Sequence, residues 1–173
     1  MKKSKLLMLL CIIILVAFNI NGYAQETLPP VTVQSLNYKY IRSVYDTSAA
    51  QPVRLLERRT ASYDVKASEF YEEDYADYFI SFYLPHGHVL ATYDNDGKLL
   101  RTAERFKNIA LPPLVRQSIA KRYPGWGTAK DVYVVNYSTE ADKIKKVYKV
   151  VLENGDKRIR VKTDEKGDFI ESD

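Results

Sequence analysis

The sequence predicts an α+β fold in which a helix followed by an antiparallel β-meander occurs twice. The first observation is an internal repeat, because the stretches 78–100 and 148–170 follow the same order of residue types 70 positions apart. Each has two alternating apolar runs separated by a turn, then an aspartate-and-glycine turn and a hydrophobic pair. The second observation is that Pro52 and Pro112, 60 positions apart, each open a segment with helical spacing of apolar residues. We therefore expect a tandem repeat with its helices on one face of the sheet.

The repeat defines the expected domain boundaries. Residues 49–108 are predicted to form the first unit and residues 109–173 the second, after a segment over residues 25–48. The paired positions are Tyr78, Phe82, Asp94, Gly97 and Leu100 in the first unit and Tyr148, Leu152, Asp164, Gly167 and Ile170 in the second.

The N-terminal segment has the features of a secretory signal peptide. Lys2, Lys3 and Lys5 form a positive start, an apolar run follows over residues 6–20, and small residues end at Ala24. We therefore predict that residues 1–24 are removed by cleavage after Ala24 and that the protein is exported to the periplasm. A membrane anchor is the alternative, but a transmembrane helix needs about 20 apolar residues, and no basic stop-transfer cluster follows.

Removal of this segment changes the charge and the cysteine count. The 26 Lys and Arg residues become 23 without the three N-terminal lysines, against 22 Asp and Glu. A near-neutral chain gives no support to general nucleic-acid binding, which needs a clustered basic surface. Cys11 leaves with the signal, so the remaining chain has no disulfide, no thiolate nucleophile and no cysteine-ligated metal. We expect no cofactor.

The segment 25–48 is predicted to be extended. Pro29 and Pro30 favour an extended backbone, and the run 31–45 is rich in Val, Ile and Tyr with partial alternation, which favours a strand or a strand and a bend. A structural envelope protein that packs against a membrane partner through this strand is one alternative function.

The first unit is predicted to begin with a helix over residues 49–63. A short strand is expected at 70–75, within an acidic cluster that would discourage stray pairing at an edge. A three-strand meander then follows over residues 78–84, 88–93 and 99–106, because its second turn contains Asp-Asn-Asp-Gly, a strong hairpin signal.

The second unit repeats the plan with a longer connection. Pro112 and Pro113 open a helix that ends at Tyr123-Pro124-Gly125, since proline cannot continue a helix and glycine suits its terminal left-handed residue. The expected strands cover residues 131–137, 146–153, 156–163 and 169–171, with a polar loop over residues 138–145.

A family resemblance is carried by four segments of the second unit. They are the helix end Ile-Ala-Lys-Arg-Tyr-Pro-Gly-Trp at 119–126, the strand 132–137, the strand Val-Tyr-Lys-Val-Val-Leu at 147–152 and the turn Thr-Asp-Glu-Lys-Gly at 163–167. The chain thereby resembles the PepSY-like domain of exported bacterial proteins, which is similar to one half of a β-lactamase-inhibitory protein. The resemblance covers residues 111–170 and extends to 52–106 through the repeat. It implies helices on one face of an antiparallel sheet, export, a role in binding or inhibiting proteins, and no catalytic residues.

Two other site types are weighed and set aside. A calcium loop beginning at Asp94 would place Lys98 at its fifth position and Arg105 at its twelfth, where oxygen ligands are required. A nucleotidyltransferase site would use His86-Gly87-His88, but no glycine-rich loop precedes this triplet and no helix follows it to bind phosphate. Two histidines alone also make a poor zinc site. We therefore expect neither an enzyme nor a metal protein, and keep nucleotide transfer as an alternative function.

The repeat also predicts which strand positions face the helices. Tyr78, Ile80 and Phe82, with their counterparts 70 positions later, are apolar in both units, so we assign them to the core. The alternate positions then form an open sheet face with aromatic and basic residues, which dominate the energetics of protein interfaces. The candidate protein-binding residues are Phe79, Tyr83, His88, Leu90, Lys149, Arg158, Arg160 and Lys162. The predicted function is a non-catalytic binding or inhibitor-type module for a periplasmic or envelope protein, without nucleic acid and without a stable membrane anchor after cleavage.

Overall fold

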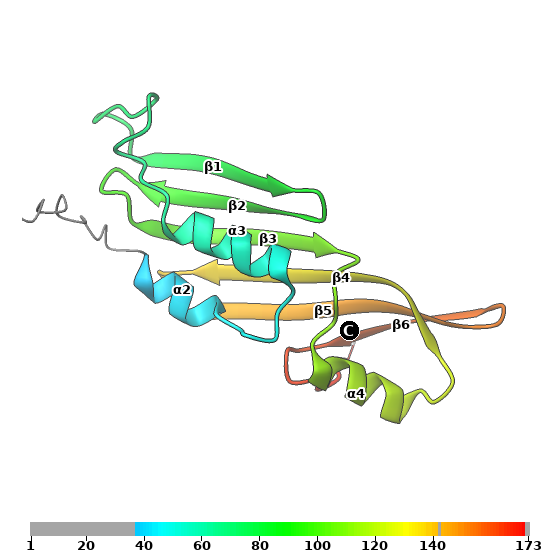
Figure 1. Cartoon of the computed structure of the whole chain (residues 1–173). Coiled ribbons are helices and arrows are strands. Elements are labelled where there is room, and N and C mark those ends of the chain that lie inside the picture. Colours follow the sequence, from blue (N-terminus) through cyan, green and yellow to red (C-terminus); the bar gives the residue numbers. More distant parts are fainter. Residues whose placement is uncertain (1–36, 142, 172–173) are drawn as a thin grey trace, which may run out of the picture. The chain divides into compact units, whose positions relative to one another are not determined.

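The computed structural model describes residues 37–141 and 143–171. The predicted signal peptide, its cleavage site and the first part of the N-terminal segment lie outside these residues. The described chain is α+β and contains one open antiparallel sheet and a few helices (Figure 1). The helices are α2 (Tyr38–Val44), α3 (Gln51–Ala61) and α4 (Pro113–Arg122).

The sheet follows the order of the chain. Its strands β1 to β6 lie side by side in sequence order, and every neighbouring pair is antiparallel. Their bounds are β1 Asp77–Leu84, β2 Gly87–Asp94, β3 Leu99–Lys107, β4 Gly127–Ser138, β5 Lys143–Asn154 and β6 Lys157–Thr163. A helix thus precedes three strands twice, and Figure 1 shows α2, α3 and α4 on the same face of the sheet.

The helix-facing side of the sheet forms the core, as the alternation in the sequence predicted. Phe82 and Leu152 are both buried there, and Tyr78, Val89, Ala91, Tyr148, Val150 and Val161 are buried with them. Helix α3 contributes Val53 and Leu56, and α4 contributes Val115 and Ile119. Each helix therefore buries one stripe against the sheet.

The two aspartate-and-glycine turns adopt the same hydrogen-bonding geometry. Asp94 Oδ1 accepts from the N–H of Asp96 and Lys98, and the N–H of Gly97 donates to Asp94 O. Seventy positions later, Asp164 Oδ1 accepts from the N–H of residues 166 and 168, and the N–H of Gly167 donates to Asp164 O. Both glycines have positive φ, 80° and 88°, so a side chain at either position would be strained.

Four expected elements differ from the structure. The run 31–45 was expected to be a strand, but residues 38–44 form α2, because Tyr40 and Val44, one helical turn apart, are both buried. Residues 70–75 form turns rather than a strand. The polar loop expected at 138–145 is shorter, because Ile144 and Lys145 pair with Tyr137 and Asn136 and extend β4 and β5. The expected strand at 169–171 is only one bridge, between Thr163 and Phe169.

Candidate functional site

The face of the sheet opposite the helices is apolar over β1 and β2. Phe79 is 72% exposed, Tyr83 65% and Leu90 45%. Phe79 and Leu90 line a hollow of about 440 Å³ that continues across β3 to Asn136 on β4. Large apolar side chains that stay in water beside a hollow are available for contact with another molecule.

The same face is basic over β3 to β6. Strand alternation and register place these lysine and arginine residues on it: Arg101, Arg105, Lys107, Lys130, Lys143, Lys145, Lys149, Arg158, Arg160 and Lys162. Among its described residues, this face carries the carboxylates Asp77, Asp94 and Glu153. Ten cations against three carboxylates create a positive potential over the face.

The carboxylates neutralise little of this charge. Glu153 Oε2 accepts a hydrogen bond from Arg158 Nη2 at 3.4 Å, which makes an exposed ion pair. Within the described chain, this is the one ion pair on the open face. Asp94 already accepts hydrogen bonds within its turn. Lys130, Arg158 and Arg160 line a hollow of about 480 Å³ beside that ion pair. The positive end of the face therefore has a recess that could accept acidic groups.

The predicted binding residues all lie on this face. Phe79, Tyr83, Leu90, Lys149, Arg158 and Arg160 are exposed, whereas His88 and Lys162 are half-buried. Two further positions assigned to the open face are buried instead: Thr92, whose Oγ1 accepts from Arg101 Nε at 3.2 Å, and Val147. Arg101 therefore lies against Thr92.

Sequence reasoning missed the basic residues of β3 and β4 and those that begin β5. The open face was predicted only from the strands that the repeat relates. Because β3 pairs with β4, the basic residues of these two strands lie on the same face. The alternation of Arg101, Ala103 and Arg105 with Thr102 and Glu104 was a signal that could have placed these residues on one face.

The histidines of the His86-Gly87-His88 triplet lie at the hairpin between β1 and β2, as the turn signals predicted. His86 is exposed in the turn, and His88 is opposite Tyr83 and Arg105 on the neighbouring strands. The hollow that they share with Tyr83, Arg105 and Lys107 has a volume of only about 140 Å³. No described helix begins at this turn, so the triplet lacks the backbone donors that phosphate binding uses.

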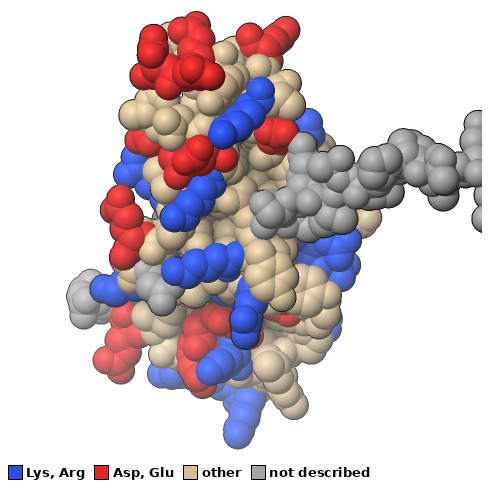
Figure 2. Space-filling view, turned by 90° about the vertical axis from the view of Figure 1, so that its left-hand side faces the viewer, with Lys and Arg blue, Asp and Glu red and all other residues tan. Residues whose placement is uncertain are grey.

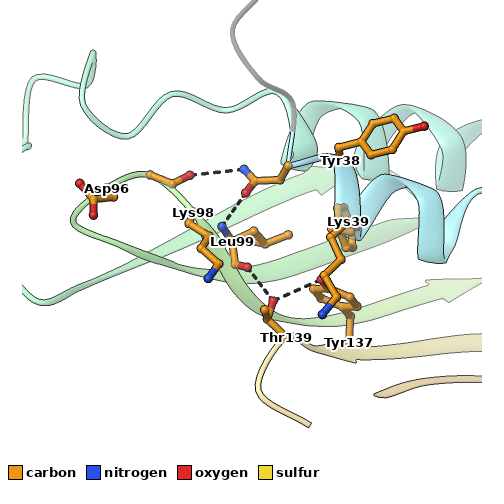
Figure 3. Close-up of a pocket in the computed structure, with 10 residues that line it drawn as sticks. Tyr38, Lys39, Asp96, Lys98, Leu99, Tyr137 and Thr139 are labelled. Atoms are coloured by element: carbon orange, nitrogen blue, oxygen red, sulfur yellow. Dashed lines mark hydrogen bonds between the residues drawn. The ribbon is translucent and has the colours of Figure 1, made fainter. Parts of the chain in front are cut away.

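A hollow of about 270 Å³ lies between the start of α2 and the β2–β3 turn (Figure 3). Two of its polar side chains, Asn37 and Thr139, are already hydrogen-bonded within the protein. Asn37 donates to Gly97 O at 3.3 Å and accepts from the N–H of Leu99 at 2.7 Å. Thr139 donates to Leu99 O at 2.9 Å, and its hydroxyl also contacts the Tyr137 hydroxyl at 3.2 Å. The Asn37 bonds hold the start of α2 against the sheet, and the Thr139 bonds connect β3 and β4, so both have a structural role.

Two carboxyl groups are buried beneath α2 and α3. Glu104 Oε1 accepts from the Tyr40 hydroxyl at 2.8 Å and from the Thr102 hydroxyl at 2.7 Å. Glu57 Oε1 and Glu104 Oε2 have no hydrogen-bond partner among the residues that the structure describes. Burial and, to a smaller extent, the nearby Glu104 raise the pKa of Glu57 to about 9, while Lys146 opposes the shift. Burial also raises the pKa of Glu104 to about 7, against its two hydroxyl donors. At neutral pH Glu57 is therefore protonated.

The other large pKa shifts belong to core tyrosines. Burial raises the pKa of Tyr40, Tyr93, Tyr133 and Tyr148 well above the usual range, so their hydroxyls stay neutral. Tyr133 and Tyr148 stack with ring centroids 4.2 Å apart. These groups stabilise the core.

The comparisons with family models, with curated proteins and with solved structures find no match. Within residues 37–141 and 143–171, no group of three or more His, Cys, Asp or Glu side chains is placed to hold a metal ion. No described helix is long and apolar enough to span a membrane.

Proposed function

We propose that this chain is an exported, non-catalytic binding protein that engages an acidic periplasmic or envelope protein through the open face of its sheet. The observation that carries the proposal is the excess of lysine and arginine over carboxylates on that face, beside exposed Phe79, Tyr83 and Leu90. Basic residues would steer and orient an acidic partner, and the apolar residues would supply buried area.

The charge on the inner strands of this face, β3 to β5, has no evident structural purpose. Side chains on alternate positions of one strand lie about 7 Å apart, and those on neighbouring strands about 5 Å apart. Lys149 and Lys162 are directly opposed on β5 and β6, and Lys149 is also opposite Val132 on β4. Like charges opposite each other destabilise a sheet. A binding role would explain why the arrangement is nevertheless present.

We also propose that the chain is built from two PepSY-like units and shares the architecture of β-lactamase-inhibitory proteins. The matching turns at Asp94 and Asp164 support the duplication, since both have the same hydrogen bonds and a glycine at positive φ. A helix before each set of strands also supports it, as do the hairpins β1–β2 and β5–β6, which have the same pairing register 70 positions apart. A role in binding or inhibiting another protein follows from this resemblance.

Export is expected to leave Gln25 as the N-terminal residue, because Gly22 and Ala24 suit signal peptidase. Mass spectrometry of the protein purified from its native envelope identifies the N-terminal residue. Detection of Met1, or of a lipid on Cys11, would contradict the proposed processing.

Reversal of two charges is expected to weaken partner binding while the fold is retained. The double variant Arg158→Glu and Arg160→Glu changes exposed side chains and leaves the helix-facing Ile159 and Val161 in place. After capture of the partner from periplasmic extract, binding kinetics should show an affinity loss of at least about tenfold, mainly through slower association.

A matched variant tests whether partner binding depends on the position of the basic residues or only on the net charge of the protein. Lys121→Glu and Lys166→Glu change the net charge equally but lie on α4 and on the turn after β6, away from the open face. This variant should bind as the wild type does. His86→Ala and His88→Ala should also keep most of the affinity. Loss of nucleotide binding in the histidine variant, with the arginine variant unaffected, would refute the binding module and favour the nucleotidyltransferase.

A further inference from the structure

The two edges of the sheet are protected to different extents. At the β6 edge, the N–H of Ile170 donates to Lys162 O at 2.8 Å and Phe169 bridges to Thr163, so the chain covers part of this strand. Strand β6 also carries Lys157, Arg158, Arg160 and Lys162. Charged side chains and a covering segment are the usual means of preventing a further strand from pairing.

Strand β1 is protected less, because the preceding segment contacts it at Tyr78, through Tyr71, Tyr75 and the Glu72 backbone, and the strand itself has few charges. Its eight residues, Asp-Tyr-Phe-Ile-Ser-Phe-Tyr-Leu, carry one charge, at the first position. Within the described chain, the backbone of β1 is hydrogen-bonded only to β2, and Figure 1 shows β1 at the margin of the sheet. Its outer backbone donors and acceptors are therefore available to another strand.

The surroundings of the two ends of β1 differ in charge, acidic at its start and basic at its end through residues of β3. Glu69, Glu72, Glu73, Asp74 and Asp77 are exposed in the segment that leads into the strand. The largest group of red atoms in Figure 2 lies at the level of this segment in Figure 1. At the other end of β1, Tyr83 shares a hollow with His86, His88, Arg105 and Lys107.

If two copies are related by a two-fold axis perpendicular to the sheet, the start of β1 in one copy lies beside the end of β1 in the other. Two β1 strands that pair antiparallel bring the acidic end of each copy beside the basic end of the other, twice. Directly opposed residues in an antiparallel pair project to the same face, so an axis through Ser81 places Phe79 opposite Tyr83 of the second copy. The interface then gains two aromatic pairs and a continuous hydrogen-bond ladder.

We propose that β1 binds a second copy of this chain, and that the two sheets join edge to edge as an isologous dimer. The contact uses the rim of the sheet and leaves the basic residues of β4 to β6 exposed. Phe79 and Tyr83 belong to both contacts, so the dimer and the proposed binding function share these two side chains.

Sedimentation of the full chain at low ionic strength tests the proposal. The wild type is expected to dimerise at about 100 µM, and added salt should weaken the dimer by screening its end contacts. Ser81→Lys should weaken dimerisation at least about tenfold, because two lysines would then be opposed at the axis. The matched control is Ala103→Lys, which places the same side chain in the same cross-strand row but two strands inside the sheet, and it should dimerise as the wild type does.

Charge exchange keeps the proposal testable even if Ser81→Lys perturbs folding. Glu73→Lys with Asp74→Lys gives one variant, and Arg105→Glu with Lys107→Glu gives another. Each alone should dimerise more weakly, because like charges then lie near one another at both ends of the contact, and a mixture of the two should form heterodimers. A monomeric wild type, an unaffected Ser81→Lys dimer, or a mixture that stays monomeric would each overturn the proposal.

Discussion

Phe82→Ala and Leu152→Ala are each expected to lower the free energy of unfolding by about 2–5 kcal/mol. Leu152 is fully buried on β5, and Phe82 on β1 is 4% exposed. The Phe82 ring contacts Tyr63 edge to face at a centroid distance of 5.3 Å and lies 6.0 Å from the Arg59 guanidinium. Truncation would leave a cavity between the helices and the sheet that fixed backbone elements cannot fill. Urea denaturation followed by circular dichroism measures the loss.

Phe79, on the same strand as Phe82, provides the control variant for the Phe82→Ala prediction. Phe79→Ala makes the same change three residues earlier, on the open face, where the side chain is mostly in water. It should cost less than about 1 kcal/mol. Equal losses for Phe79→Ala and Phe82→Ala would mean that the core and the open face have been assigned the wrong way round.

Raising the pH from about 5 to 9 is expected to destabilise the protein through Glu57. Its native pKa of about 9 lies far above that of an exposed glutamate, so the folded chain keeps a proton that the unfolded chain releases. Unfolding then becomes more favourable as the pH rises, by up to about 1.4 kcal/mol per pH unit across this window. Glu104, with a native pKa of about 7, adds to the slope at the lower end of the window. The other ionisable groups that interact with the pair include Lys146, Asp46, Tyr40, Tyr133 and Tyr148.

Glu57→Gln isolates this effect. Glutamine keeps the shape of the side chain but cannot ionise, so the variant should lose most of the pH dependence and exceed the wild type in stability at pH 9 by a few kcal/mol. Chemical denaturation at a series of pH values measures the difference. Glu73→Gln, at an exposed position, should behave as the wild type. A wild-type stability that is constant or rises from pH 5 to 9 would contradict the buried, protonated state of Glu57.

Strand alternation predicted more of this molecule than residue propensity did. Period-two patterns identified β1, β2 and β3 and assigned Tyr78, Ile80 and Phe82 to the helix face. The prolines that open α3 and α4 marked both helix starts closely. Such patterns work because burial requires one consistent face on each element.

The missed features depend on contacts that no local pattern encodes. The tyrosines and β-branched residues of 38–44 favour a strand by propensity, yet packing of Tyr40 against Glu104 and Tyr137 is realised in α2. The burial of Glu104 could have been predicted from the sequence, because Glu104 and Phe106 are two positions apart on β3 and therefore share its helix-facing side. Its partners come from distant elements and could not be read in this way.

The central claim is that the open face binds an acidic partner, and lysine acetylation in the presence and absence of the captured partner tests it most directly. The face carries Lys107, Lys130, Lys143, Lys145, Lys149 and Lys162, whereas Lys66, Lys98, Lys121 and Lys166 are exposed elsewhere. We expect partner binding to protect the first group, most strongly Lys149 and Lys162, and to leave the second unchanged. Protection of the second group with no change on the open face would contradict the account.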